Sequence, residues 1–513
     1  MPEEFFAKLK KNIPTQWKFS FFTAIIVGLA VHLYKLANWL PNWDSLVFRY
    51  DPQNMVAMGR WFLPVACAPS SFYDLPWLNG LLAILLHALG AVCICKMFRV
   101  RKNTTAALIG AVVISFPTVA SVLMYNYVAD GYALAFLLSC MAAMLLVSEK
   151  PKYILSVICI ALSAGIYQAY ITVTVMLLLC YLILEALRED SKVGALIGRS
   201  LRILLAGAVG MALYYALMTI IIKITGSALI EYQGLDEAMS LSGIDLHGAL
   251  YTIKNTFMDY FFDFSVGVSV FSILNCVILG LTAVLYITDI IRKKTPVGKI
   301  LLVVFYAAFL PIASSLLALI NSGVDYHNLM KMGFFVFYLF FILQYEKLDF
   351  KRERLNTVKA WTILTLVLVL VFNHSVIANV SYHKLKMAYE KSYGVLVRIA
   401  DRIEQTEGAE DCDSILVLGA LEDSEAYSAN LPPDMTGTTD GYILRADDEV
   451  VSQSVLCSAL NDYCGKDYRF LAGEEKSALL EKIDIDSMGI WPQNDSIFVI
   501  DNVIVIRLGD EVK

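Results

Sequence analysis

Residues Phe19–Ala37 read FSFFTAIIVGLAVHLYKLA, a strongly apolar stretch. A helix of this length spans the roughly 30 Å hydrocarbon core of a bilayer. The residues before it are basic, as in a signal peptide, but the run is too long for the apolar part of one. It also lacks a small-residue cleavage site. We therefore expect this stretch to be the first transmembrane helix.

Apolar runs of similar length recur along the chain. Of its 513 residues, 58% are hydrophobic and only 17% are charged, whereas soluble proteins carry roughly 25% charged residues. The sequence therefore predicts an α-helical polytopic membrane protein. About eleven transmembrane helices are expected, near residues 19–37, 77–97, 104–124, 131–148, 152–166, 168–187, 200–224, 266–289, 299–320, 331–346 and 358–380.

The Lys and Arg residues between these runs predict the orientation, because cytoplasmic loops are enriched in them. The N-terminal segment and every second loop after it carry 23 Lys and Arg, whereas the alternate loops carry 4. We therefore expect residues 1–18 to be cytoplasmic, the transmembrane domain to cover 19–380, and the C-terminus to be extracytoplasmic. The expected location is the cytoplasmic (inner) membrane of a bacterium.

The tail, residues 381–513, is polar and acidic, with 12 Lys and Arg against 26 Asp and Glu. Strands are expected at 414–421 and on both sides of a turn at Asp501–Asn502, with helices near 451–461 and 474–482. A helical stretch at 384–406 would tether this small C-terminal extracytoplasmic α/β domain. A disulfide among Cys412, Cys457 and Cys464 stays open, since pairing cannot be read from sequence.

The weakly basic loops hold a set of polar and aromatic residues that are far apart in sequence but expected at one membrane level. Ionisable residues at the ends of spans are costly and usually have a partner or a function. The set therefore predicts a site between helix ends on the external face. Its members are Trp43, Asp44, Arg49, Asp51, Arg60, Trp61, Tyr127, Asp130, Tyr167, Gln168, Asp325, His327 and Lys331.

The acidic members each have a structural and a catalytic interpretation. Asp44 follows the first span and is either a general base toward a hydroxyl or the N-cap of a short interfacial helix. Asp130 lies directly before a span, where the same two roles apply, and Tyr127 beside it suits a sugar. Asp51 precedes a proline and fits a turn or an N-cap better than a substrate contact.

The basic and polar members also have two interpretations each. Arg60 suits a phosphate through paired hydrogen bonds, or it anchors the chain at the membrane interface beside Trp61. Lys331 is either a phosphate contact or a lysine that extends its ammonium group to the interface. Gln168 is a backbone cap or a substrate contact. His327 is a proton carrier or a polar loop residue.

Several function classes have no motif here. The chain lacks the phosphate-binding G-x-x-x-x-G-K-[ST] pattern of ATP-driven proteins, the H-E-x-x-H of zinc proteases and the G-x-S-x-G of serine hydrolases. Its acidic soluble part has the wrong charge for nucleic acid. No cofactor is expected; a divalent metal is compatible with the acids but not indicated by their spacing.

Four short motifs, in this order, resemble the bacterial type-two Gtr glucosyltransferases, which are membrane enzymes of the GT-C architecture. The resemblance covers roughly residues 18–380. The motifs are NWD at Asn42–Asp44, GRWF at Gly59–Phe62, AD at Ala129–Asp130 and YQ at Tyr167–Gln168.

The resemblance implies transfer of a hexose, typically glucose, from a polyprenyl-phosphate donor to a surface polysaccharide such as an O-antigen or cell-wall glycopolymer. It implies inversion at the anomeric carbon, Asp44 as the base and Asp130 as its assistant. Where the family often keeps an arginine facing the donor phosphate, this chain has Lys331, so Arg60 and Arg49 become rival phosphate contacts. A flippase for lipid-linked saccharide and a polysaccharide polymerase or ligase remain the alternatives.

Overall fold

The computed structural model describes residues 2–3, 13–41, 45, 55–228, 245–263, 270–324, 326–419 and 449–509. The described chain divides into two compact units. The helical unit holds the residues up to Asn38 and between Pro52 and Asn379. The sheet unit holds Trp39 to Asp51 and most of the residues after Asn379.

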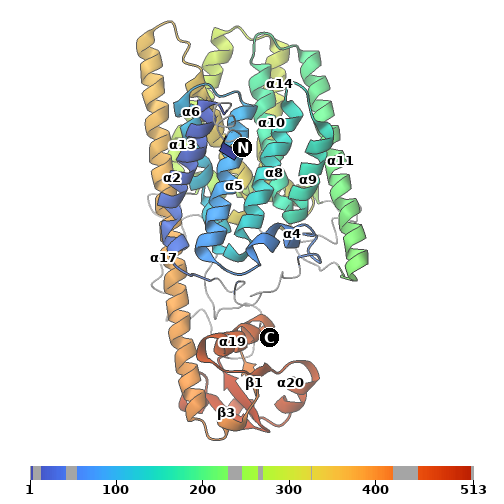
Figure 1. The fold of residues 1–513 in the computed structure, drawn as a ribbon, viewed down its shortest axis with the longest axis vertical. Coiled ribbons are helices and arrows are strands. Elements are labelled where there is room, and N and C mark those ends of the chain that lie inside the picture. The colour runs from blue at the N-terminus through green and yellow to red at the C-terminus, as the bar shows by residue number, and fades with distance from the viewer. Residues whose placement is uncertain are drawn as a thin grey trace. The chain divides into compact units, whose positions relative to one another are not determined.

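The helical unit is built from long helices joined by short ones (Figure 1). Its α-helices are α2 (Thr15–Ala37), α4 (Leu63–Cys67), α5 (Pro76–Met97), α6 (Asn103–Ser115), α7 (Pro117–Met124), α8 (Ala129–Val147), α9 (Tyr153–Ile166), α10 (Ile171–Ala186), α11 (Val193–Thr225), α12 (Leu246–Phe262), α13 (Val270–Arg292), α14 (Val297–Ala308), α15 (Leu310–Ser314), α16 (Phe335–Leu343) and the start of α17 (Glu353–Gln405). Its 3₁₀ turns are η1 (Ala68–Ser70), η2 (Asn126–Val128), η3 (Gln168–Tyr170), η6 (Leu316–Leu319), η7 (Asn328–Met330), η8 (Met332–Phe334) and η9 (Gln344–Glu346).

The described residues contain eight helices that are long and apolar enough to cross a membrane, as expected of a polytopic membrane protein. A ninth is gained if α6 and α7 count as one span, bent by 41° where Pro117 follows Phe116, because a proline disfavours helical geometry in the residue before it. The expected spans at 152–166 and 331–346 correspond to shorter apolar helices. The total of eleven therefore stays a prediction.

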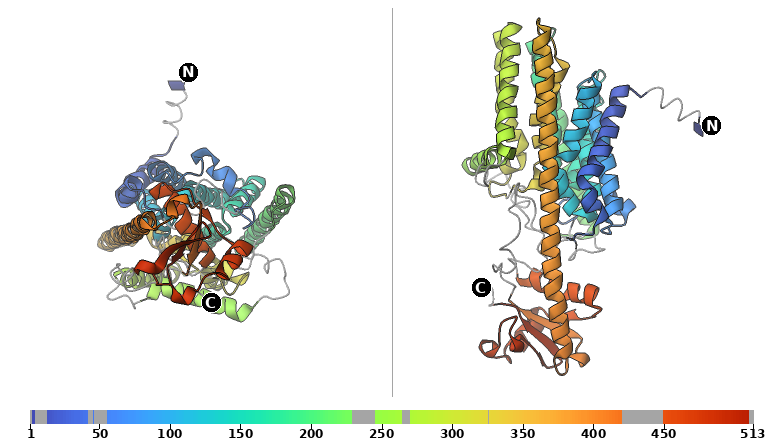
Figure 2. Two further views of the ribbon diagram at one scale, coloured as in Figure 1. Left: turned by 90° about the horizontal axis from the view of Figure 1, so that it is seen from below. Right: turned by 90° about the vertical axis from the view of Figure 1, so that its left-hand side faces the viewer.

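Helices α2, α5, α6 and α8 pack closely against one another (Figure 1). At Gly110 a Cβ atom would lie 2.3 Å from the backbone oxygen of Ser20, so α6 can approach α2 only without a side chain there. Small residues allow this kind of backbone approach between membrane helices. Helix α12, which lies in an expected external loop, runs across the direction of the long helices (Figure 2).

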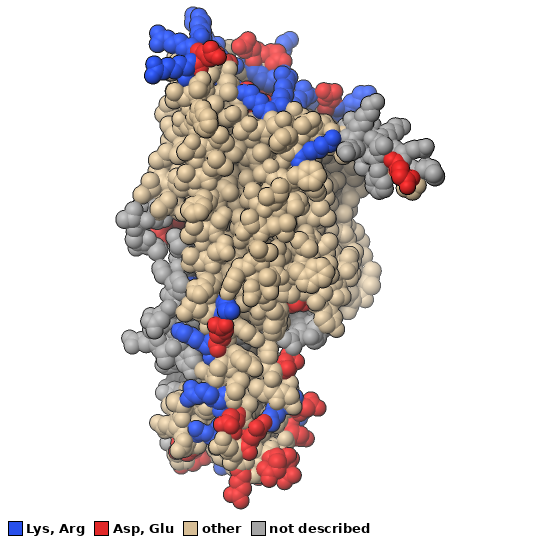
Figure 3. Space-filling model, turned by 60° about the vertical axis from the view of Figure 1, so that its left-hand side comes forward, with Lys and Arg blue, Asp and Glu red and all other residues tan. Residues whose placement is uncertain are grey.

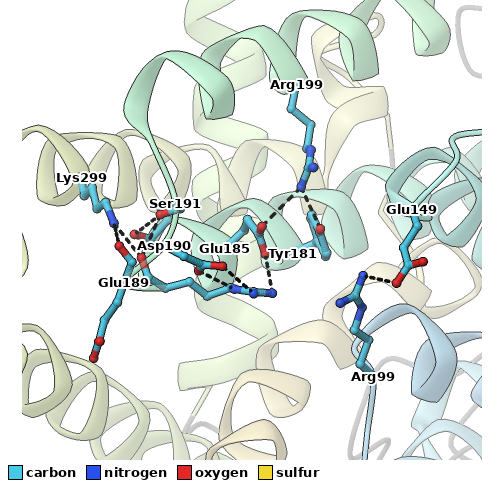
Figure 4. Close-up of polar contacts among 11 residues, drawn as sticks. Arg99, Glu149, Tyr181, Glu185, Glu189, Asp190, Ser191, Arg199 and Lys299 are labelled. Atoms are coloured by element: carbon cyan, nitrogen blue, oxygen red, sulfur yellow. Dashed lines mark hydrogen bonds and ion pairs between the residues drawn. The ribbon is translucent and has the colours of Figure 1, made fainter.

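Charged residues gather at one end of the helical unit, here called the basic end, next to a broad uncharged band (Figure 3). Contacts at this end join loops that are distant in sequence. Arg99 pairs with Glu149, Arg292 with Asp349, and the Lys299 ammonium donates to the Arg188 backbone oxygen. Arg188 pairs with Glu185 and Asp190, and Glu185 also pairs with Arg199. Figure 4 shows Glu185, Asp190 and Arg199 together with their dashed contacts.

The sheet unit contains a four-stranded sheet of order β2-β1-β4-β3. Its strands are β1 (Ser414–Leu418), β2 (Arg469–Phe470), β3 (Ile497–Ile500) and β4 (Val503–Arg507). Strand β1 is parallel to β2 and β4, and β3 pairs antiparallel with β4. Its helices are the end of α17, α19 (Glu449–Cys464) and α20 (Gly473–Leu480), with 3₁₀ turns η10 (Ala409–Asp411), η11 (Ile485–Ser487) and η12 (Asn494–Ser496).

Local sequence explains the sheet. Asp501 and Asn502 both have positive φ, which is the geometry of a tight hairpin turn that Asp and Asn tolerate. Alternate residues of β1 and β4 face opposite sides: Ile415 and Ile504 pack with α17 and α19, whereas Leu416 and Val505 pack with α20. The strand expected at 414–421 is present over Ser414–Leu418, and the two strands expected around the 501–502 turn are also present; residues 420 and 421 lie outside the described chain. All ten cysteines are free thiols.

Candidate functional site

Short helical turns interrupt the chain directly before three long helices, and hydrogen bonds tie these turns together. The Phe62 backbone nitrogen donates to the Gly165 oxygen (2.8 Å), and the Gln168 side chain donates to the Met58 oxygen (3.0 Å). The Thr118 hydroxyl donates to the Asn328 backbone oxygen (2.9 Å). Segments that are up to about 200 residues apart in sequence therefore meet at this place, which we call the site end.

Arg60 is buried in aromatic surroundings. Its side chain is 8% exposed, its guanidinium lies 4.7 Å from the centre of the Tyr167 ring, and its Nη1 donates to the Tyr132 hydroxyl (3.2 Å). Tyr132 and Tyr167 stack on each other, with 4.9 Å between ring centres. A cation over aromatic faces is held in a defined orientation. The buried position does not fit an anchor exposed at the membrane interface.

Asp130 is the second residue of α8 and is 4% exposed. The N-cap of α8 is Val128, with no side-chain cap, so Asp130 does not act as the N-cap. Its Oδ1 atom is buried and has no hydrogen-bond partner. The helix N-terminus favours a carboxylate at this position. The oxygen is therefore available to a group that comes from outside the chain.

The thiol of Cys67 lies close to Asp130. A Cβ atom on Gly131 would lie 2.7 Å from the Cys67 sulfur. Burial raises the pKa of the Cys67 thiol well above its usual value, and the Asp130 charge raises it further. Because the thiolate is the nucleophilic form, Cys67 is unsuited to covalent catalysis.

Gln168 and Trp61 hold the turns in place. The Gln168 amide nitrogen donates to Met58 and also to the Tyr214 hydroxyl (3.0 Å), so it fastens the chain before Arg60 rather than capping its own helix. Trp61 packs against Gly165, where a Cβ atom would lie 2.7 Å from the indole. Tyr127 is buried, at 3% exposed.

The other expected site residues divide into two groups. His327 and Lys331 are half-buried on either side of η7, which contacts α7. The remaining members lie outside the described residues, and their roles stay predictions: Trp43, Asp44, Arg49, Asp51 and Asp325. Among the described residues no three His, Cys, Asp or Glu side chains gather as metal ligands, and the expectation on metal stays open because three of the acids are outside that set.

Sequence reasoning missed four polar residues at the site end, of which three are buried and Asp74 is half-buried. Lys35, Asn79 and Asn126 are fully buried, and the Asn126 side chain donates to Asp74 (2.7 Å). Lys35 interacts electrostatically with Asp74. These residues are hard to recognise as site candidates from the sequence, because Lys35 and Asn79 fall inside apolar runs. A lysine at the end of a span that faces away from the Lys-rich loops is the one clue that could have identified them.

The model of one protein family, described as glucosyl transferase GtrII, matches residues 33–345, which is more than half of the chain. The chain belongs to the GtrII glucosyl transferase family. The family match includes α4, η2, η3 and η7, and thus every described residue of the site end that the sequence predicted. It ends before α17 and most of the sheet unit. The GtrII assignment makes the chain a glucosyltransferase and confirms the resemblance drawn from the four motifs.

No curated protein and no solved structure shows significant similarity to the chain.

Proposed function

We propose that this GtrII glucosyltransferase moves glucose from a polyprenyl-phosphate donor to a surface polysaccharide at the outer face of the bacterial cytoplasmic membrane. The observation that supports the proposal is that the site end holds both a buried carboxylate oxygen without a partner, at Asp130, and a buried guanidinium, at Arg60. Both are linked to α8: Asp130 is its second residue, and Arg60 donates to the hydroxyl of Tyr132 in the same helix.

The site end thus holds the two kinds of group that the reaction requires, a carboxylate and a cation. The acceptor hydroxyl oxygen attacks the anomeric carbon while the bond from that carbon to the phosphate oxygen breaks. The transition state resembles an oxocarbenium ion, with negative charge growing on the phosphate. A carboxylate takes the hydroxyl proton, and a cation stabilises the departing phosphate.

We assign the general base to Asp44, as the resemblance implies, with Asp130 as the second carboxylate. Arg60 is the leading phosphate contact because it is buried and its orientation is set by Tyr132 and Tyr167. Arg49 and Lys331 are its rivals. The remaining aromatic and polar residues of the predicted set would bind substrate: Trp43, Asp51, Trp61, Tyr127, Tyr167, Gln168, Asp325 and His327.

A lipid-linked donor agrees with the position of the site. The residues that form it lie where long apolar helices begin, and a polyprenyl phosphate places its sugar-phosphate head at the membrane interface. No nucleotide-binding motif occurs in the chain, and a donor of this kind requires none.

The first test supplies purified protein in lipid nanodiscs with radiolabelled short-chain polyprenyl-phosphate-glucose and with UDP-glucose, each with a polysaccharide acceptor. Label should reach the polymer from the lipid donor alone, and Asp44→Asn should lower the rate by ~10²–10⁴-fold with normal expression. Transfer from UDP-glucose alone would overturn the donor assignment. Equal activity of the Asp44→Asn variant would remove Asp44 from the mechanism.

The second test concerns sidedness. Ser71 is exposed at the site end and Lys150 at the basic end. A membrane-impermeant maleimide should label Ser71→Cys in intact spheroplasts and Lys150→Cys only after permeabilisation. The opposite pattern would place the site in the cytoplasm and exclude the proposed reaction.

A further inference from the structure

A second group of buried polar side chains lies beside Asp130. Asp74 is in the loop before α5, Asn79 is in the first turn of α5, and Asn126 is in η2. The Asn79 amide nitrogen donates to the backbone oxygens of Asn126 (2.9 Å) and Tyr73 (3.1 Å). The Asn126 amide nitrogen donates to Asp74 Oδ1 (2.7 Å). The three side chains are therefore one hydrogen-bonded group.

These bonds fix the direction of both amides. Carbonyl and carboxylate oxygens can only accept, so the nitrogen of each amide must face them and each Oδ1 must face elsewhere. Both Oδ1 atoms and the second oxygen of Asp74 are buried and have no hydrogen-bond partner. Buried side-chain oxygens without a donor are rare in folded proteins. Three of them in one group indicate that donors arrive from outside the chain.

The group lies close in the chain to Asp130, the proposed second carboxylate. Asn126 is in the 3₁₀ turn η2, and Asp130 is the second residue of α8, which follows that turn directly. The two residues are therefore at the same end of one helix. A hexose could therefore contact both at once.

The chemistry of the group selects its ligand. The three available atoms are all acceptors, so the ligand must present several donors close together, as the hydroxyls of a sugar ring do. An anionic ligand would be repelled by Asp74. The buried Lys35 interacts electrostatically with Asp74.

We propose that Asp74, Asn79 and Asn126 form the subsite that recognises the hydroxyl groups of the transferred hexose while its anomeric carbon lies at Asp130. This inference rests on the proposed function and adds the residues that select the sugar. A site built to bond a hydroxyl rejects an analogue that lacks it, because buried polar groups are then left without partners.

The test measures transfer from polyprenyl-phosphate-glucose and from its 2-, 3-, 4- and 6-deoxy analogues. The wild type should use at least one deoxy donor ~100-fold less well than glucose. Asn79→Ala and Asn126→Ala should lose a similar factor with glucose and use that deoxy donor nearly as well as glucose. The loss of transfer caused by removing the sugar hydroxyl and the loss caused by removing the amide would then be non-additive, as expected for two groups that contact each other.

Asn275→Ala is the matched control. Asn275 is also fully buried, but both of its amide atoms have partners: the nitrogen donates to the Tyr260 backbone oxygen and the oxygen accepts from the Tyr338 hydroxyl. This variant should lower thermal stability and keep the wild-type preference against the deoxy donors. If Asn79→Ala and Asn126→Ala also keep that preference, they act only on structure and the subsite is overturned.

Equilibrium binding of the same lipids, and of polyprenyl phosphate without sugar, separates this inference from the proposed function. Binding of the bare lipid should be the same in the wild type and both variants, which also shows that they fold. If the wild type binds the glucose lipid without transferring glucose, and the variants lose the preference among deoxy lipids, the subsite holds and the transfer proposal fails. If the wild type binds the glucose lipid no better than the bare lipid, the subsite is overturned.

Discussion

The two ends of the helical unit treat polar side chains in different ways. At the basic end, buried charge is satisfied within the chain: Asp289, 3% exposed, contacts Arg292, Lys347 and Gln344. At the site end, Asp130 and Asp74 each keep a buried carboxylate oxygen without a partner. The comparison teaches that burial alone does not identify function. What distinguishes the site end is buried carboxylate capacity, at Asp130 and Asp74, that the chain itself leaves unused.

The largest expected effect comes from removing that capacity. Asp130→Asn should reduce glucose transfer by ~10²-fold, the lower end of the range for proton transfer, because Asp130 is the second carboxylate beside the base. The thermal unfolding temperature should stay nearly unchanged, because the amide keeps the size of the carboxylate and Asp130 Oδ1 accepts no hydrogen bond from the chain. Activity and unfolding should be measured on the same preparation. Loss of stability together with activity would show that Asp130 is structural, like Asp289.

Asp289→Ala should show the reverse behaviour. The change leaves the buried Gln344 and the half-buried Lys347 without their acceptor, and removing one partner of a buried hydrogen bond costs about 1–3 kcal/mol of unfolding free energy. Transfer per folded molecule should stay close to wild type. Denaturation in detergent measures the first quantity and the transfer assay the second; a specific loss of turnover would erase the distinction between the two ends.

Arg60→Lys should lower donor use by about 10-fold, because lysine keeps the charge but loses the planar fork that bonds a phosphate and stacks on Tyr167. The measurement is kcat/KM for the lipid donor, with the acceptor KM as reference. Lys331→Ala serves as the comparison within the site end. A larger loss of donor use in Lys331→Ala than in Arg60→Lys would make Lys331 the main phosphate contact.

The smallest effect is expected at an exposed ion pair of the basic end. Arg99 and Glu149 lie 3.2 Å apart with side chains 60% and 83% exposed, and such pairs contribute only about 0–1 kcal/mol. Arg99→Ala should therefore unfold within a few degrees of wild type and keep full transfer activity. A fall in unfolding temperature as large as that of Asp289→Ala would mean that exposed and buried charges at this end act as one network.

The amino-acid sequence by itself determined the class of protein, the positions of its long apolar helices, the strands at 414–418 and 497–507, and the GtrII family. These features follow from hydrophobicity, turn residues and short motifs, which are properties of neighbouring residues. It also identified Arg60, Tyr167 and Asp130 as members of one set, because polar residues at the ends of spans are conspicuous against apolar runs.

Only the tertiary structure decided which polar atoms have partners. Arg60 meets Tyr132 and Tyr167, Gln168 fastens the backbone at Met58, and Asn79 joins Asn126 across 47 residues. Sequence could not separate a cap from a binding residue at Asp130, or detect Asn79 inside an apolar run. The physical reason is that hydrogen-bond satisfaction is a relation between side chains brought together by packing, whereas hydrophobic patterning is written along the chain.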